Sequence, residues 1–276
     1  MTTRAIVCNY LFNKRREQTM KESIKRRAFS APILSAISLS LFGVAIFSLP
    51  SIFTLQKDGL FILNIVCRAA AAIVAFVLAN VYGFRTFSKP PITRSAILLL
   101  ILGLSVCVNN FPVIGLFTGG VKIANGRDIL KYLCYCAAIG ISEESVFRGL
   151  VMPLVHFGLK DKRHSPLLTV AVSAGIFALC HLFNVFSAGV AATLLQVGYT
   201  FLTGCLFGTV YLFTKNIVFP ILLHFIYDIG GLIFSAPFYI AVGNQWDTYT
   251  VIITAALGIF TAAVFTVCLW KYNAAE

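Results

Sequence analysis

The chain has 276 residues, of which 59% are hydrophobic and only 12% are charged. Soluble domains carry about 25% charged residues, so this composition excludes a cytosolic enzyme, a disordered protein and a nucleic-acid-binding domain. The formal net charge is +12, and in so apolar a chain we expect the bases at cytoplasmic loops and against anionic lipid.

Residues 1–30 are polar and rich in Lys and Arg, and they lack the short apolar core that a cleavable signal peptide requires. We interpret this segment as a cytoplasmic basic arm that determines the topology. An alternative is that the arm lies along the lipid surface. We expect residues 31–276 to form a single transmembrane domain.

Eight apolar blocks follow one another, each close to the roughly 20 residues with which a helix crosses a bilayer. Charged or turn-forming residues separate them. The sequence therefore predicts an all-α, polytopic transmembrane helix bundle of about eight spans, with a seven-span bundle as the alternative. The blocks are 32–55, 60–84, 95–117, 129–157, 167–187, 190–213, 217–240 and 249–270.

The distribution of the bases predicts the orientation. With the amino terminus in the cytoplasm and eight alternating spans, sixteen bases fall on the inner side and four on the outer side. Cytoplasmic loops carry the excess of Lys and Arg, so both termini should be cytoplasmic. We expect a multi-pass protein in the plasma membrane of a bacterium. The four outer bases are Lys57, Lys122, Arg127 and Lys131.

Seven residues with Arg, Glu, Asp or His side chains stand out deep inside the predicted spans, where a charge costs several kcal/mol and usually marks function. Arg68 is alone in its span, so it either lies near a tilted helix end or pairs with a carboxylate. The other six form three groups on three spans: Glu143, Glu144 and Arg148 in the fourth, His181 in the fifth, and His224 and Asp228 in the seventh.

The fourth span presents two adjacent glutamates to different faces of a helix. Glu144 and Arg148 are four residues apart and share a face, so Arg148 can neutralise Glu144. Glu143 is turned away by about 100°, so we expect it to be less well paired and suited to general acid–base catalysis. An ion pair that staples two helices is the alternative, but it would need only one of the glutamates.

His224 and Asp228 are also four residues apart, so the acid can lie beside the imidazole. His181 taken alone could equally be hydrogen-bonded to a backbone carbonyl. A carboxylate and an imidazole can polarise a water, and a second imidazole with a polar neighbour can stabilise an oxyanion. Together these six residues supply the groups needed to hydrolyse an amide inside a membrane. The chain contains no Gly-x-Ser-x-Gly nucleophile motif, and this chemistry does not need one.

The three groups resemble the signature of the CPBP family, the CAAX proteases and bacteriocin-processing enzymes, also called the Abi family. Its pattern is Glu-Glu-x-x-x-Arg, then Phe-x-x-x-His, then His-x-x-x-Asn/Asp on successive core helices. The chain has all three motifs in order within residues 129–240, with Phe177 before His181. The resemblance implies an intramembrane endopeptidase; eukaryotic members trim the last three residues from prenylated CAAX proteins.

The resemblance also implies roles for the fourth-span and fifth-span residues. Glu143 and His181 would activate the water, while Glu144 and Arg148 would hold the geometry of the site.

His224 and Asp228 would, by the same resemblance, form the oxyanion site. Where the family has Asn at the last position, its amide can donate a hydrogen bond. Asp228 can donate only when protonated; otherwise it would orient His224, as the acid of a catalytic triad does.

The sequence contains no His-Glu-x-x-His motif, and we favour catalysis without a metal or other cofactor. Zinc held by Glu143, His181 and His224 is the alternative, because these are the ligand types of catalytic zinc. The expected partners are membrane lipid and a peptide or protein substrate, either lipidated or a peptide precursor, and no nucleic acid.

Two other functions compete with the protease. One is a non-proteolytic membrane regulator or immunity protein on the same fold, which would be expected to lose motif residues. The other is a proton-coupled transporter, which should show inverted repeats and broken helices. The complete set of motif residues favours the protease.

Overall fold

The computed structural model describes residues 21–91, 93–235, 238–243 and 248–275. The first twenty residues of the predicted basic arm lie outside this part of the chain. Residues 21–30 are helical, and Phe29 packs on Tyr82 and Phe157, with ring centroids 6.0 and 4.3 Å away. The second part of the predicted arm is therefore joined to the bundle by aromatic contacts.

The first half of the chain forms a helical hairpin and a third long helix. Helix α3 ends at Gly83, whose φ of 83° lies in the left-handed region that favours glycine. Thr93 caps the next helix, α4, by accepting a hydrogen bond from the Ala96 amide over 3.1 Å. The elements are α2 (Pro32–Ser48), the 3₁₀ turn η1 (Leu49–Ile52), α3 (Lys57–Tyr82), α4 (Arg94–Asn109) and the short α5 (Val113–Thr118).

The second half contains two composite helical units. Helix α6 (Ile129–Val146) continues through a π-helical turn, η2 (Phe147–Val151), into α7 (Met152–Leu159). Helix α8 (Ser165–Cys180) continues through a 3₁₀ turn, η3 (His181–Asn184), into α9 (Val185–Ala188). Arg148 and His181 lie in these irregular turns, and π-helical turns are frequent at functional sites. The remaining helices are α10 (Val190–Thr214), α11 (Val218–Gly231) and α12 (Thr248–Ala275).

These units confirm the predicted all-α membrane bundle. Within the described part of the chain, five helical units are long and apolar enough to cross a membrane, and α4 and α11 are shorter apolar helices. Counted as composite units, the helices from α2 to α12 overlap the eight predicted blocks one by one, although α11 ends at Gly231 and its block was predicted to reach residue 240. The expectation that all eight cross the bilayer stays a prediction.

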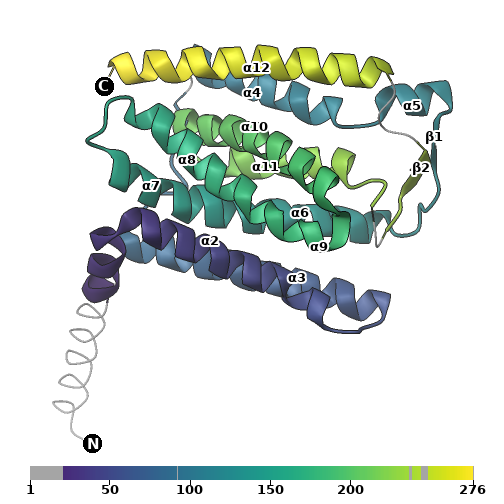
Figure 1. The fold of residues 1–276 in the computed structure, drawn as a ribbon, viewed down its shortest axis with the longest axis horizontal. Helices are drawn as coiled ribbons and strands as arrows, with labels where there is room; N and C mark the ends of the chain where they lie inside the picture. Colours follow the sequence, from purple (N-terminus) through teal and green to yellow (C-terminus); the bar gives the residue numbers. More distant parts are fainter. Residues whose placement is uncertain (1–20, 92, 236–237, 244–247, 276) are drawn as a thin grey trace, which may run out of the picture.

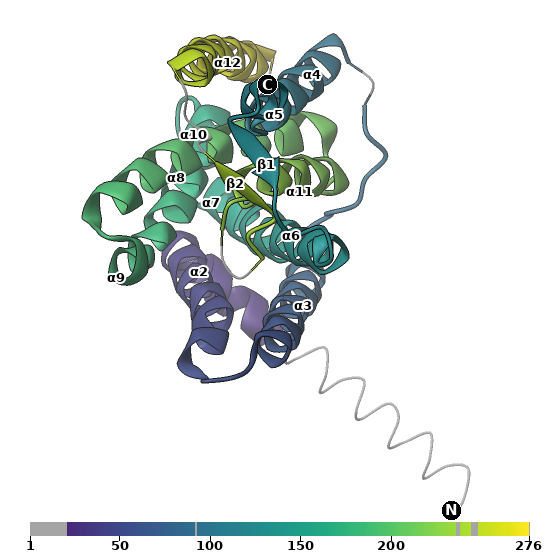
Figure 2. The same ribbon diagram turned by 90° about the vertical axis from the view of Figure 1, so that its right-hand side faces the viewer.

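Helix α6 occupies a central position in the bundle. It packs against α3 on one side and against α11 on the other. Figures 1 and 2 show the α2–α3 hairpin along one side of the bundle and α4 with α12 along the opposite side. The helix that carries the two glutamates therefore lies between α3 and α11, which can keep its buried polar groups away from lipid, while its Leu130 and Ile141 side chains are exposed.

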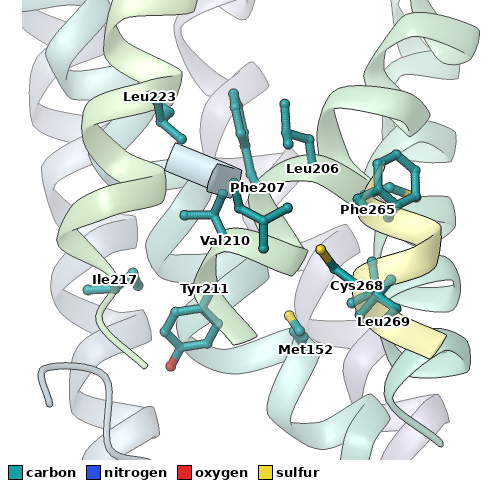
Figure 3. Packing of buried hydrophobic residues seen from close by; sticks show 14 of the residues in the cluster. Met152, Leu206, Phe207, Val210, Tyr211, Ile217, Leu223, Phe265, Cys268 and Leu269 are labelled. Carbon is teal, nitrogen blue, oxygen red and sulfur yellow. The ribbon is translucent and has the colours of Figure 1, made fainter. Parts of the chain in front are cut away.

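A cluster of buried apolar side chains joins α10, α11 and α12 (Figure 3). Phe207 and Val210 of α10 lie at its centre, beside Leu223 of α11. Between helices in a bilayer, such side chains stabilise the bundle by van der Waals packing, because lipid tails are equally apolar and supply no hydrophobic driving force. Because His224 directly follows Leu223, this packing also places the histidine.

At one end of the bundle, the loops after α3 and α10 meet the end of α12. The Asn216 side-chain amide donates to the Ser88 carbonyl over 2.9 Å, and Lys215 Nζ lies 2.8 Å from the Tyr272 hydroxyl. The helix at residues 21–30 lies at this end as well (Figure 1). These are segments that the distribution of bases predicts to share the cytoplasmic side.

At the opposite end, the loop before α6 meets the segment before α3 and the segment after α11. Lys57 Nζ lies 2.7 Å from an Asp128 carboxylate oxygen, and this ammonium holds the pKa of the Asp128 carboxyl below its usual range. A short strand, β1 (Val121–Ile123), pairs antiparallel with β2 (Ala241–Gly243). The four bases that were predicted to be external all lie at this end of the bundle.

The predicted orientation can be checked by cysteine labelling on a background in which the native cysteines are replaced. We expect Lys162→Cys to react only from the cytoplasmic side, because inner loops carry the excess of bases. Lys122→Cys in β1 is the matched control and should react only from outside. Labelling of Lys162→Cys from outside would contradict the predicted topology.

Candidate active site

The predicted pairing of Glu144 with Arg148 is confirmed. The side chain of Glu144 is fully buried, and one of its oxygens accepts a hydrogen bond from Arg148 over 2.9 Å. The same guanidinium donates to the Gly204 carbonyl over 3.1 Å and lies over the Phe177 ring, 4.8 Å from its centroid. Arg148 is therefore held by contacts with α6, α8 and α10.

Glu144 also orients His224. The same glutamate oxygen lies 2.7 Å from His224 Nδ1, and because a carboxylate accepts, Nδ1 donates. The other ring nitrogen, Nε2, then faces Glu143 Oε2 at 3.9 Å and Asp228 Oδ2 at 3.7 Å. One buried carboxylate thus directs the free side of the imidazole toward two further acids.

This contact requires α6 and α11 to approach closely, which Gly140 allows. A Cβ atom at this position would lie 3.1 Å from the Phe225 nitrogen and 3.2 Å from the Ile221 oxygen. These atoms are backbone, which cannot move aside as a flexible side chain can. The absence of a side chain at Gly140 therefore brings the two motif-bearing helices together.

Asp228 lies beside His224 as predicted, but the 3.7 Å separation is too long for a hydrogen bond. Its Oδ2 atom is buried without a hydrogen-bond partner in the described part of the chain. The Tyr132 hydroxyl donates to the Ile229 carbonyl over 2.7 Å and ties this part of α11 to α6. A buried polar atom without a partner calls for an explanation, and a functional role is one.

Glu143 is, as expected, less well paired than Glu144, which contacts both Arg148 and His224, but it does have one cationic partner. Arg68 of α3 reaches it, with 3.3 Å between a guanidinium nitrogen and Glu143 Oε1. A carboxylate partner, one of the two explanations offered for Arg68, is therefore the correct one. Glu143 still differs from Glu144, since its side chain is 14% exposed rather than fully buried.

His181 makes a hydrogen bond to a backbone carbonyl, which is one of the two interpretations that the sequence left open for it. Its Nδ1 lies 3.0 Å from the Phe177 carbonyl, so Nδ1 donates and Nε2 keeps a lone pair. The Phe177 ring contacts both imidazoles edge-on, with centroids 5.0 Å from His181 and 6.2 Å from His224. This shared ring brings the two histidines of separate spans to one region, and Glu143 lies there too, 3.9 Å from His224 Nε2.

The structure therefore brings together all six candidate residues and adds Arg68. Three carboxylic acid groups face two guanidinium groups, so protonation of either Asp228 or His224 would balance the remaining negative charge. Such balance matters because an uncompensated buried charge costs several kcal/mol. The residues of this cluster are Arg68, Glu143, Glu144, Arg148, His181, His224 and Asp228.

The described residues present no preformed group of ligands for the zinc alternative. Within the described residues, no three His, Cys, Asp or Glu side chains form a group that could hold a metal ion. Because His224 donates from Nδ1 to Glu144, Nε2 is the ring nitrogen left for a metal, and it is 3.9 Å from the nearest Glu143 oxygen. We derive no catalytic step through a metal.

Residues 125–230 match the family described as "Type II CAAX prenyl endopeptidase Rce1-like". The matched segment contains α6 to most of α11 and all six candidate motif residues. It confirms the resemblance to the CPBP and CAAX proteases and indicates a peptidase with a helical membrane fold. The chain matches no curated protein and no solved structure.

Proposed function

We propose that this chain, with its CAAX-type peptidase segment at residues 125–230, is an intramembrane endopeptidase that uses activated water. The observation that carries the proposal is the contact of Glu144 with both Arg148 and His224, at 2.9 and 2.7 Å. It directs His224 Nε2 toward Glu143 and Asp228, so that acids and imidazoles from separate helices converge on one place.

Glu143 is the proposed general base. Its Oε1 is engaged by Arg68, while Oε2 faces His224 without a hydrogen bond among the described residues. Oε2 takes a proton from the attacking water while the oxygen of that water forms a bond to the scissile carbonyl carbon. The same carboxylic acid then returns the proton to the leaving amine as the carbon–nitrogen bond breaks.

His181 is proposed to orient this water. Its Nδ1 proton is held by the Phe177 carbonyl, so Nε2 can accept a hydrogen bond from the water. The water would then be held between one imidazole and one carboxylate, as general base catalysis requires.

His224 and Asp228 are proposed to stabilise the oxyanion. With Nδ1 donating to Glu144, a protonated His224 donates from Nε2 to the developing negative charge. Asp228 contributes a second donor when it is protonated, and its Oδ2 is buried without a partner in the described structure. The charges of Arg68 and Arg148 offset those of the two glutamates around this site.

The proposed substrate is a membrane-associated or lipidated peptide or protein. Candidates are a bacteriocin leader, a peptide pheromone precursor and a prenylated CAAX tail. The segments between the predicted spans are short, so recognition would take place within or at the surface of the membrane. A substrate that is itself anchored in the bilayer suits such a site.

The proposal is tested by peptide mass spectrometry of membranes that contain either the wild type or Glu143→Ala. We expect peptides that depend on the wild type and disappear with the variant. Their synthetic precursors are then incubated with purified protein, with and without a chelator. The absence of any peptide that depends on the wild type would contradict a protease. If a chelator stopped cleavage and added zinc restored it, the metal-free mechanism would be wrong.

Replacing Asp228 with Asn tests its role in the oxyanion site. If Asp228 donates a hydrogen bond as a neutral acid, the amide of Asn can also donate, and we expect activity within about tenfold of the wild type. The variant should stay active at higher pH, because an amide does not ionise and stop donating. A pH–rate profile of both purified proteins checks this. A large loss at every pH would instead mean that an ionised Asp228 orients His224.

A further inference from the structure

Arg68 is a buried arginine that lies outside the segment matched by the peptidase family. It is on α3, far in sequence from residues 125–230, and only 9% of it is exposed. A charge at this depth in an apolar helix is expensive and usually has a partner. In the structure, Arg68 contacts a residue of the candidate active site, Glu143.

Two aromatic rings hold the guanidinium of Arg68. Its central carbon lies 5.0 Å from the Phe47 ring centroid and 5.8 Å from that of Tyr135, which belong to α2 and α6. Planar guanidinium groups stack on aromatic faces, and such contacts restrict their orientation. The α2–α3 hairpin therefore presents a pre-oriented cation to α6.

The polar contacts of Arg68 go to two neighbouring residues of α6. One nitrogen lies 3.4 Å from the Ser142 hydroxyl and 3.3 Å from Glu143 Oε1. Because this contact occupies Oε1, the other oxygen of Glu143 is the one that faces His224. Arg68 thus determines which carboxylate oxygen is presented to the reaction.

We infer that Arg68 is a positioning residue for Glu143, so that the α2–α3 hairpin completes a catalytic site whose other members lie on α6, on the turns η2 and η3, and on α11. This inference rests on the proposed function in giving Glu143 the role of base. The contact between the two side chains can also be tested without measuring activity.

The first experiment compares the steady-state kinetics of Arg68→Gln and Arg68→Lys with those of the wild type. We expect Arg68→Gln to lower kcat on the order of 100-fold with little change in KM, because a small misplacement of the base is enough for such a loss. Arg68→Lys keeps the positive charge and should recover part of the loss. Lys57→Gln is the matched control: it removes an ion pair from the exposed end of the same helix and should leave kcat unchanged.

The second experiment is a double-mutant cycle on apparent unfolding temperature with Arg68→Gln, Glu143→Gln and the double variant. Residues in direct contact show non-additive effects, so the double variant should lose less than the sum of the single losses. This cycle does not depend on catalysis and remains informative if the variants are inactive.

The outcomes separate the two proposals. If the wild type cleaves and Glu143→Gln does not, but Arg68→Gln keeps a normal kcat, the positioning role is wrong and the protease stands. If nothing is cleaved but the cycle shows coupling, the contact stands and the proposed function fails. Additive losses in the cycle would overturn the assignment of Arg68 to Glu143.

Discussion

Replacing Glu143 with Gln should abolish cleavage while the protein remains folded. Gln keeps the shape of the side chain and can still accept a hydrogen bond from Arg68, which lies 3.3 Å from Glu143. It cannot take a proton from water, and general base catalysis contributes about 10²- to 10⁴-fold to the rate. The measurement is turnover by purified protein, together with its apparent unfolding temperature.

Glu22→Gln provides the matched control for this variant. Glu22 is exposed on the helix at residues 21–30, so the same chemical change there should leave turnover unchanged. Near-normal turnover by purified Glu143→Gln would show that Glu143 is not the base. A loss of folded protein in place of a loss of rate would show that its role is structural.

Replacing Glu144 with Gln should reduce both activity and stability. Glu144 is fully buried and contacts Arg148 and His224 through one oxygen. Its neutralisation leaves Arg148 without a counter-charge, and breaking a buried ion pair in this way costs about 3–5 kcal/mol. We expect lower yield, a lower apparent unfolding temperature and reduced turnover of the protein that remains folded.

An exposed ion pair gives the control for Glu144→Gln. Lys131 and Asp58 are only 2.6 Å apart, but their side chains are 43% and 72% exposed. Exposed pairs contribute about 0–1 kcal/mol, so Asp58→Asn should change the unfolding temperature little. Equal losses from the two variants would contradict the claim that burial makes the Glu144 pair important.

Adding Arg148→Met to Glu144→Gln separates charge from catalysis. Removing both charges should restore part of the stability, because replacement of a whole buried ion pair by apolar groups is often neutral or stabilising. Activity should stay low, since His224 would still lack its charged acceptor. Recovery of activity together with stability would contradict an electrostatic role for Glu144.

Local spacing was enough to predict the contacts that lie within one helix. Glu144 and Arg148 are four residues apart in the continuous helical unit of α6 and η2, and they form the expected pair at 2.9 Å. The apolar blocks likewise predicted the helical units, because a helix needs a certain length to cross a bilayer and its composition must suit lipid. The helical spacing and the length of an apolar block both depend only on residues that are close in sequence, so both can be read from the sequence.

Spacing was less informative where a contact depends on exact side-chain position. His224 and Asp228 were expected beside each other from the same four-residue rule, and they are 3.7 Å apart without a hydrogen bond. The α6 residue Tyr132 donates to the Ile229 carbonyl and anchors this part of α11. The position of Asp228 relative to His224 therefore depends also on contacts with α6, which the periodicity of α11 alone does not determine.

By itself, the sequence determined the all-α membrane fold, the three motif groups and the buried Glu144–Arg148 pair. Only the tertiary structure decided that Glu144 also binds His224, 80 residues away, and that Arg68 contacts Glu143 across 75 residues. The physical reason is that these contacts depend on how closely helices approach, as at Gly140 between α6 and α11. Helical periodicity says which face a residue occupies, but only packing decides which helix lies opposite that face.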